Sequence, residues 1–265
     1  MKKSLLFICI SLMMIACKSE FERVRTSNDP ALIYKKALEF YDNEDWVKSQ
    51  TLLELSIPNY RGKAEAEELF LKFAYTHYYN NEFILAAHYF KSFSSTFYNS
   101  EKKEEAEFMS AYSNYRMSPN PKLDQTYTEK AIEGLQLFVN TFPRSERVAE
   151  CNELMDELRV KLERKALEQG ELYYNIGQYE AAVKSFSNML NDYPDAAQAE
   201  RVRYLMVKAT YEFAKKSIYD KKLERFEESE VLYNKFLKKH PQSRYLKEVR
   251  NIHSNIVEEL KKLRA

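Results

Sequence analysis

The sequence predicts an all-α protein, a superhelical stack of about five helix-turn-helix repeats. Charged residues make up 31% of the 265 residues and are interspersed along the chain, which has only four glycines and seven prolines. So few glycines and prolines leave little room for the tight turns of an antiparallel β protein. A recurring pattern of small and aromatic residues then indicates that the helices come in pairs.

Three segments of the N-terminal half superimpose without gaps at a step of 37 residues. In each, an alanine is followed four positions later by a tyrosine, which places both on one face of a helix. The small residue lets two helices approach closely, and the ring locks them together. The pairs are Ala37 and Tyr41, Ala74 and Tyr78, and Ala111 and Tyr115, and the second helices are expected at residues 46–57, 83–97 and 128–142.

A fourth repeat, at residues 166–194, is the clearest of all. Its second helix has an apolar stripe from Tyr179 to Leu190 at helical spacing. A fifth repeat extends from about Tyr204 to Pro241. The fourth repeat comes close to the spacing of the tetratricopeptide repeat (TPR), so all five units are interpreted as TPR-like. The residues that carry this spacing are Gly170, Tyr173, Gly177, Tyr179, Ala182, Phe186 and Pro194.

The connections divide the chain into two halves. The third repeat contains an insertion with two prolines at residues 118–121, which predicts a loop. Residues 146–169 contain no proline or glycine, which predicts one long helix coupling the halves. We therefore expect TPR-like repeats 1–3 at residues 30–145. The long linking helix, repeats 4–5 and a C-terminal helix are expected at residues 146–265.

The N-terminus has the order of a bacterial secretory signal. Two lysines precede a short apolar run, and Ala16 and Cys17 follow it. The run is too short to span a bilayer. Residues 14–17 resemble a lipoprotein lipobox, which implies cleavage of a signal peptide at residues 1–16, lipid attachment at Cys17 and a tether at residues 17–29. The alternative is a soluble secreted protein whose signal ends near a cysteine.

Composition and motifs argue against several functions. Cleavage of residues 1–16 removes two lysines and no acids, so 41 basic residues become 39 against 40 acidic ones. This balance gives no basic field for nucleic acid. We also expect no metal site, no cofactor and no enzymatic activity. The four histidines lack metal-binding motifs, the glycines form no phosphate loop, and the paired glutamates lie in polar helical stretches.

The candidate binding residues are tyrosines on the first helices of the repeats. A stack of helix pairs leaves a concave surface lined by these helices. Tyrosine offers a large contact area and a hydroxyl with few rotors to freeze, which suits binding an extended peptide. The alternative is that the rings only fill the core between repeats. The candidates are Tyr34, Tyr41, Tyr75, Tyr78, Tyr112 and Tyr115.

Residues 118–148 carry the most specific resemblance of the chain. The sequences LDQT, AIEGLQLFVNTFP and SERV there resemble the third repeat of BamD-type lipoproteins of the outer-membrane β-barrel assembly machinery, in the version found in Bacteroidetes-type bacteria. Gly134 departs from the alanine expected at its position. The resemblance covers nearly all of the chain after the predicted signal peptide.

The resemblance implies a scaffold and receptor. Such a protein holds a BamA-like β-barrel insertase and other assembly-complex subunits, and it receives unfolded outer-membrane proteins through their C-terminal β-signal. Repeats 1–3 would then receive the peptide, and repeats 4–5 would dock the insertase.

The resemblance also implies an outer-membrane, lipid-anchored protein that faces the periplasm. Lys18 is not the aspartate associated with inner-membrane retention, whereas residues 18–20 half-match a signal for the cell surface. Two alternatives remain open. One is a periplasmic TPR adaptor lipoprotein for cell-wall or division machinery, and the other is a glycan-capturing surface lipoprotein.

Overall fold

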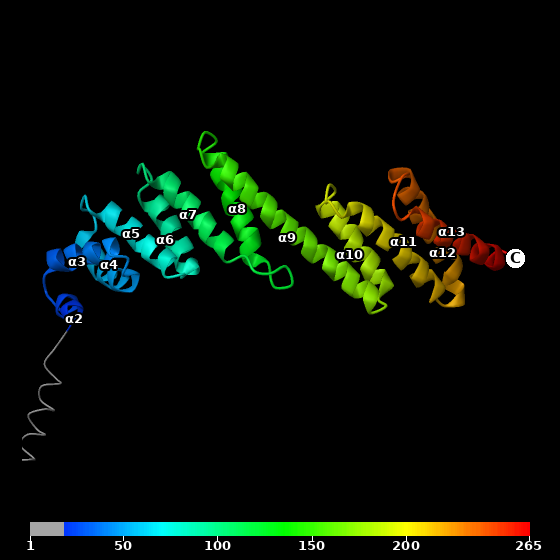
Figure 1. Ribbon diagram of the computed structural model, residues 1–265, viewed down its shortest axis with the longest axis horizontal. Helices are drawn as coiled ribbons and strands as arrows, with labels where there is room; N and C mark the ends of the chain where they lie inside the picture. Colours follow the sequence, from blue (N-terminus) through cyan, green and yellow to red (C-terminus); the bar gives the residue numbers. More distant parts are fainter. Residues whose placement is uncertain (1–18) are drawn as a thin grey trace, which may run out of the picture. The chain divides into compact units, whose positions relative to one another are not determined.

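The computed structural model describes residues 19–265, and every regular element in this range is a helix (Figure 1). The predicted all-α fold is therefore confirmed. The expected signal peptide and Cys17 lie outside the described residues. The helices are α2 (Glu20–Arg25), α3 (Pro30–Asp42), α4 (Trp46–Tyr60), α5 (Ala66–Tyr79), α6 (Phe83–Thr96), α7 (Lys103–Arg116), α8 (Thr126–Thr141), α9 (Val148–Asn175), α10 (Tyr179–Asp192), α11 (Ala199–Lys215), α12 (Tyr219–Lys239) and α13 (Leu246–Leu263).

The described chain forms two compact units. The first comprises residues 19–118 and 126–155, and the second comprises residues 119–125 and 156–265. The boundary falls inside α9, which is one continuous helix, as the absence of proline and glycine predicted. That α9 couples the two halves remains a prediction.

The first unit contains the three repeats with the 37-residue step. They are the helix pairs α3–α4, α5–α6 and α7–α8, and each helix packs against the next. Ala37, Ala74 and Ala111 are 0%, 0% and 3% exposed, so the small residues lie at the helix contacts, as predicted. Gly134 is explained by the same packing. A Cβ atom at Gly134 would lie only 2.9 Å from the Cβ atom of Ala111.

The turn inside three of the repeats has one geometry, at equivalent positions. Glu44, Asn81 and Gly177 adopt positive φ angles of 59°, 61° and 79°. The next residue in each case donates its backbone N–H to the carbonyl oxygen five positions before it, at 2.9 Å. This pattern is the Schellman motif, which ends a helix and reverses the chain. The third repeat has the predicted proline-containing loop instead, between α7 and α8.

The segment predicted as a tether contains a helix. In α2, Ser19 accepts a hydrogen bond from the backbone N–H of Glu22 and so caps the helix start. Val24 is 5% exposed in the core of the first repeat, and Phe21 packs edge-on against Phe40 at 5.9 Å. Two apolar residues thus bring a mostly polar segment into contact with the first repeat, and residues 20–25 of the predicted tether are helical.

The second unit contains repeats four and five and the C-terminal helix. The latter part of α9 pairs with α10, α11 packs against α10 and α12, and α13 packs against α12. Gly170 on α9 allows the close approach to α10, because a Cβ atom there would lie 2.3 Å from the ring of Phe186. Within residues 19–265, no helix combines the length and apolarity needed to cross a bilayer.

Candidate peptide-binding surface

Aromatic rings from four helices of the first unit form one connected set. Tyr41 at the end of α3 contacts Trp46 at the start of α4, with ring centroids 5.1 Å apart. Trp46 in turn stacks on Tyr79 of α5 at 4.3 Å. Trp46 and Tyr79 therefore join the first helices of repeats one and two, a role that sequence reasoning missed.

The contacts continue from α5 to α7. Tyr79 contacts Tyr75 at 5.8 Å and Tyr78 at 5.7 Å, and Tyr78 contacts Tyr112 at 6.3 Å. Tyr112 stacks on Tyr115 at 5.4 Å. The structure thus brings five of the six candidate tyrosines together. We call this set the aromatic surface, and it comprises Tyr41, Trp46, Tyr75, Tyr78, Tyr79, Tyr112 and Tyr115.

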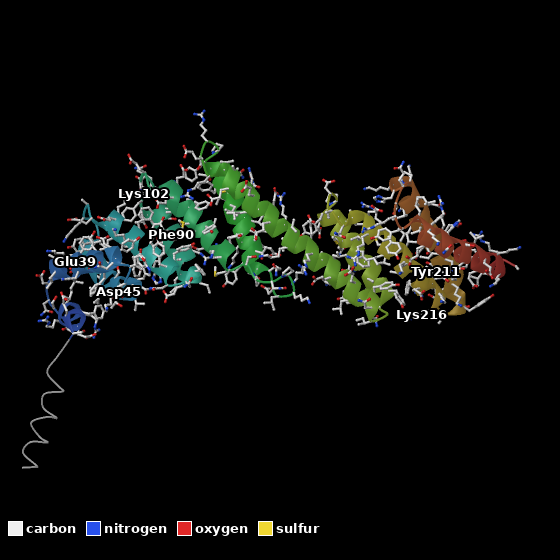
Figure 2. The ribbon with its side chains drawn as sticks, in the orientation of Figure 1. Glu39, Asp45, Phe90, Lys102, Tyr211 and Lys216 are labelled. Carbon is white, nitrogen blue, oxygen red and sulfur yellow. The ribbon has the colours of Figure 1, made fainter. Side chains whose placement is uncertain are left out.

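The aromatic surface is accessible and firmly anchored. Tyr79 is 42% exposed, and the other six side chains are partly buried. Tyr75 packs edge-on against Phe90, a fully buried residue of α6, at 4.9 Å. Figure 2 labels Phe90 among the side chains of the first unit. Rings held in this way lose little conformational freedom when a ligand binds, which favours binding.

Tyr34 does not belong to the aromatic surface. It is 8% exposed, and its ring packs against Tyr60 of α4 at 4.6 Å in the core of the first repeat. Burial, with a smaller effect of Glu68, raises the pKa of its hydroxyl to about 12. Tyr34 lies seven residues before Tyr41, about 10 Å along the helix, where α4 covers it. It fills the core, the alternative considered for these tyrosines.

Polar contacts fix the orientation of Tyr75. Its hydroxyl donates a hydrogen bond to Oε1 of Glu105 on α7. Burial, and secondarily this carboxylate, raise the pKa of Tyr75. The hydroxyl is therefore neutral and remains a donor across the physiological pH range.

Two cations lie over the rings. Lys72 Nζ lies 4.1 Å from the ring centre of Tyr41, and it pairs with Glu68 at 3.8 Å. The guanidinium carbon of Arg116 lies 4.6 Å from the ring centre of Phe83, and its Nη1 donates a 2.9 Å hydrogen bond to the hydroxyl of Tyr78. Arg116 forms no ion pair within 4.0 Å among the described residues, so its charge can serve an anionic group of a ligand.

The chemistry of this surface is that of recognition. Stacked rings accept aromatic and apolar side chains, tyrosine hydroxyls offer hydrogen bonds, and Arg116 offers a positive charge.

His77, near Tyr78 on α5, contacts Gln50 at 2.7 Å and Glu82 at 2.6 Å, and these contacts form a polar network between helices. Burial raises the pKa of the Cys151 thiol to about 11, which makes it a poor nucleophile. Within residues 19–265, no cluster of histidine, cysteine and acidic residues is placed to hold a metal ion.

Solved structures include two similar chains of low identity. One is a tetratricopeptide repeat protein from Parabacteroides merdae, with 14% identity and a TM-score of 0.35, covering 88% of this chain and 75% of its own. The other is the yeast histone chaperone Hif1, with 15% identity and a TM-score of 0.28, covering 93% of this chain and 98% of its own. No curated protein matches the chain significantly.

Comparison with models of protein families shows which family the chain belongs to. The model of the YfiO family, described as outer membrane lipoprotein, matches residues 26–224. The match includes both units and all five TPR-like repeats in whole or in part, and it agrees with the resemblance to BamD-type lipoproteins. The chain belongs to the YfiO family of outer membrane lipoproteins.

Proposed function

We propose that this protein is a lipid-anchored scaffold and receptor of the outer-membrane β-barrel assembly complex, which binds unfolded outer-membrane proteins and a BamA-like barrel insertase. Family membership supports the place in the assembly complex. The observation that carries the receptor role is the connected aromatic surface across the first three repeats.

The proposed ligand of the aromatic surface is the C-terminal strand of an unfolded barrel protein. Alternate side chains of an extended strand lie about 6.8 Å apart on one face. The rings from Tyr79 through Tyr78 and Tyr112 to Tyr115 are spaced by 5.4 to 6.3 Å. Aromatic side chains on one face of a strand can therefore stack on consecutive rings of the aromatic surface. Arg116 would pair with the terminal carboxylate.

The proposed anchor is a lipid on Cys17, with the protein at the outer membrane and facing the periplasm. Cys17 precedes the start of α2 by three residues. Because α2 packs against the first repeat, a chain of three residues, at most about 10 Å long, would separate the lipid from folded protein. The first repeat would then lie close to the membrane surface.

Co-purification of the lipidated chain tests this proposal. A C-terminal affinity tag on the full chain, extracted from outer membranes in mild detergent, should recover a BamA-like barrel protein. Recovery of a cell-wall or division complex in its place would favour the adaptor alternative. A Cys17→Ser variant should lose the lipid, measured by mass spectrometry, and stall in processing or leave the membrane fraction. Unmodified wild-type Cys17 in the soluble fraction would contradict the anchor.

A further inference from the structure

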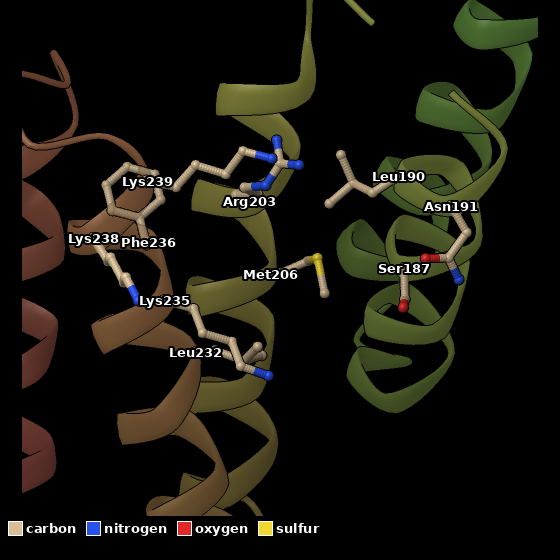
Figure 3. A pocket seen from close by; sticks show the side chains of 10 residues that line it. All are labelled: Ser187, Leu190, Asn191, Arg203, Met206, Leu232, Lys235, Phe236, Lys238 and Lys239. Carbon is tan, nitrogen blue, oxygen red and sulfur yellow. The ribbon is translucent and has the colours of Figure 1, made fainter. Parts of the chain in front are cut away.

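The second unit contains a groove of about 630 Å³ on α10, α11 and α12 (Figure 3). In this view α11 lies between its two neighbours and carries Met206 and Arg203. Four apolar side chains line the groove, three of them partly buried and Phe236 1% exposed. The apolar residues are Leu190, Met206, Leu232 and Phe236, and the polar ones are Ser187, Asn191, Arg203, Lys235, Lys238 and Lys239.

The charged residues that line the groove all have the same sign. Its four cations are Arg203, Lys235, Lys238 and Lys239, and no acidic residue lines it. None of the four forms an ion pair within 4.0 Å among the described residues. Two other cations of α11 are paired, since Arg201 contacts Glu171 at 2.5 Å and Lys208 contacts Glu248 at 3.0 Å.

The unpaired charge of the groove is also partly desolvated. Burial lowers the pKa of the Arg203 guanidinium, so a nearby counter-charge would be stabilising. Lys235 and Lys239 are exposed and free to reach a bound anion.

The face of α12 toward the groove shows a regular alternation. Leu232, Lys235, Phe236 and Lys239 occupy positions i, i+3, i+4 and i+7, which form one stripe about 10 Å long. Apolar and basic residues thus alternate along two helical turns. A ligand that complements this stripe presents apolar residues at the same spacing and acids beside them, which describes an amphipathic helix lying in a groove.

We propose that this groove binds an acidic amphipathic helical segment of a partner protein. The chain's own residues 1–18 do not suit it, because they carry three lysines and no acid. The groove lies in the second unit and is separate from the aromatic surface, so the inference stands independently of the proposed receptor role.

Site-specific photocrosslinking in native membranes tests the proposal. The photoreactive amino acid p-benzoylphenylalanine replaces exposed Asn191 in the full chain, and the crosslinked peptide is sequenced by mass spectrometry. The expected adduct is a segment of another protein with acids along one helical face and apolar residues along the other. A Lys235→Glu/Lys239→Glu change should lower its yield at least about tenfold, because like charges then face each other.

A matched control separates the groove from the general charge of the protein. Lys247 and Arg250 are exposed on α13 and do not line the groove, so Lys247→Glu/Arg250→Glu makes the same change in net charge elsewhere. This control should leave the adduct unchanged, and circular dichroism should show that both variants are folded. A lipid adduct, a basic segment, a second copy of the chain, no adduct, or an adduct insensitive to Lys235→Glu/Lys239→Glu would overturn the proposal.

Discussion

The hydroxyl of Tyr75 donates a hydrogen bond to Glu105, thirty residues further along the chain, and so ties α5 to α7 beside the aromatic surface. Tyr75→Phe keeps the ring contacts with Phe90 and Tyr79 but removes this donor. Glu105 is 30% exposed and keeps its ion pair with Lys102 at 3.2 Å. The expected loss in the free energy of unfolding is therefore about 1 kcal/mol. Urea unfolding followed by circular dichroism measures it. An unchanged midpoint would show that the bond contributes nothing to stability.

Gly170 is expected to resist substitution although it lies inside a helix. Alanine normally stabilises a helix relative to glycine by about 1 kcal/mol. Here the added Cβ atom would lie 2.3 Å from the Phe186 ring, so Gly170→Ala should cost about 1–3 kcal/mol. A second change, Phe186→Leu, should relieve the clash, so the double variant should be more stable than the sum of the two losses predicts. Stabilisation by Gly170→Ala alone would contradict this packing.

The continuity of α9 can be tested at an exposed position. Val160 is 61% exposed, so Val160→Pro changes the backbone with little change in packing. Proline inside the helix should cost about 3 kcal/mol or more, whereas Val160→Ala should be nearly neutral. In limited proteolysis, trypsin should cut after Lys161 in the proline variant and spare the wild type and the alanine control. Rapid cleavage of the native wild type there would show that α9 is not continuous in solution.

His240 should contribute to acid sensitivity. Burial, and next the charge of Arg203, lower its pKa below the usual 6.5, and its Nε2 is buried without a hydrogen-bond partner among the described residues. As pH falls below about 6.5, the unfolded chain gains a proton more readily than the folded one, so stability falls with pH. His240→Gln should therefore reduce the drop in unfolding midpoint between pH 7.5 and pH 5. An equal drop in the two proteins would contradict this.

The repeats were predictable because their signals are local. The alanines at the helix contacts, the loop after α7 and the unbroken stretch of α9 each depend on a few neighbouring residues. The sequence analysis did not anticipate α2, because this helix depends on Val24 and Phe21 reaching the core of the first repeat.

The candidate site could be predicted only in part. The 37-residue step between the repeats placed the tyrosines of the first helices on one face. It could not show that α4 covers Tyr34, or that Trp46 and Tyr79 bridge the repeats. Glu105 and Arg116 reach partners thirty or more residues away, at positions that only the packing of the helices determines.

Binding of a β-signal peptide to the aromatic surface tests the central claim most directly. The probe is a fluorescein-labelled peptide with the C-terminal strand sequence of a barrel protein and a free terminal carboxylate. Tyr78→Ala or Tyr115→Ala alone should weaken binding several-fold, since each ring contact contributes about 0.5–1.5 kcal/mol beyond its buried area. A matched control, Tyr98→Ala/Tyr219→Ala, removes two tyrosines that are 67% and 73% exposed outside the surface.

The measurement is fluorescence anisotropy on the full chain, with helical content and melting temperature checked for every variant. The account predicts binding by the wild type and by the Tyr98→Ala/Tyr219→Ala control, and a loss of at least about tenfold in the Tyr78→Ala/Tyr115→Ala variant. A folded Tyr78→Ala/Tyr115→Ala variant that binds the peptide as well as the wild type would contradict it.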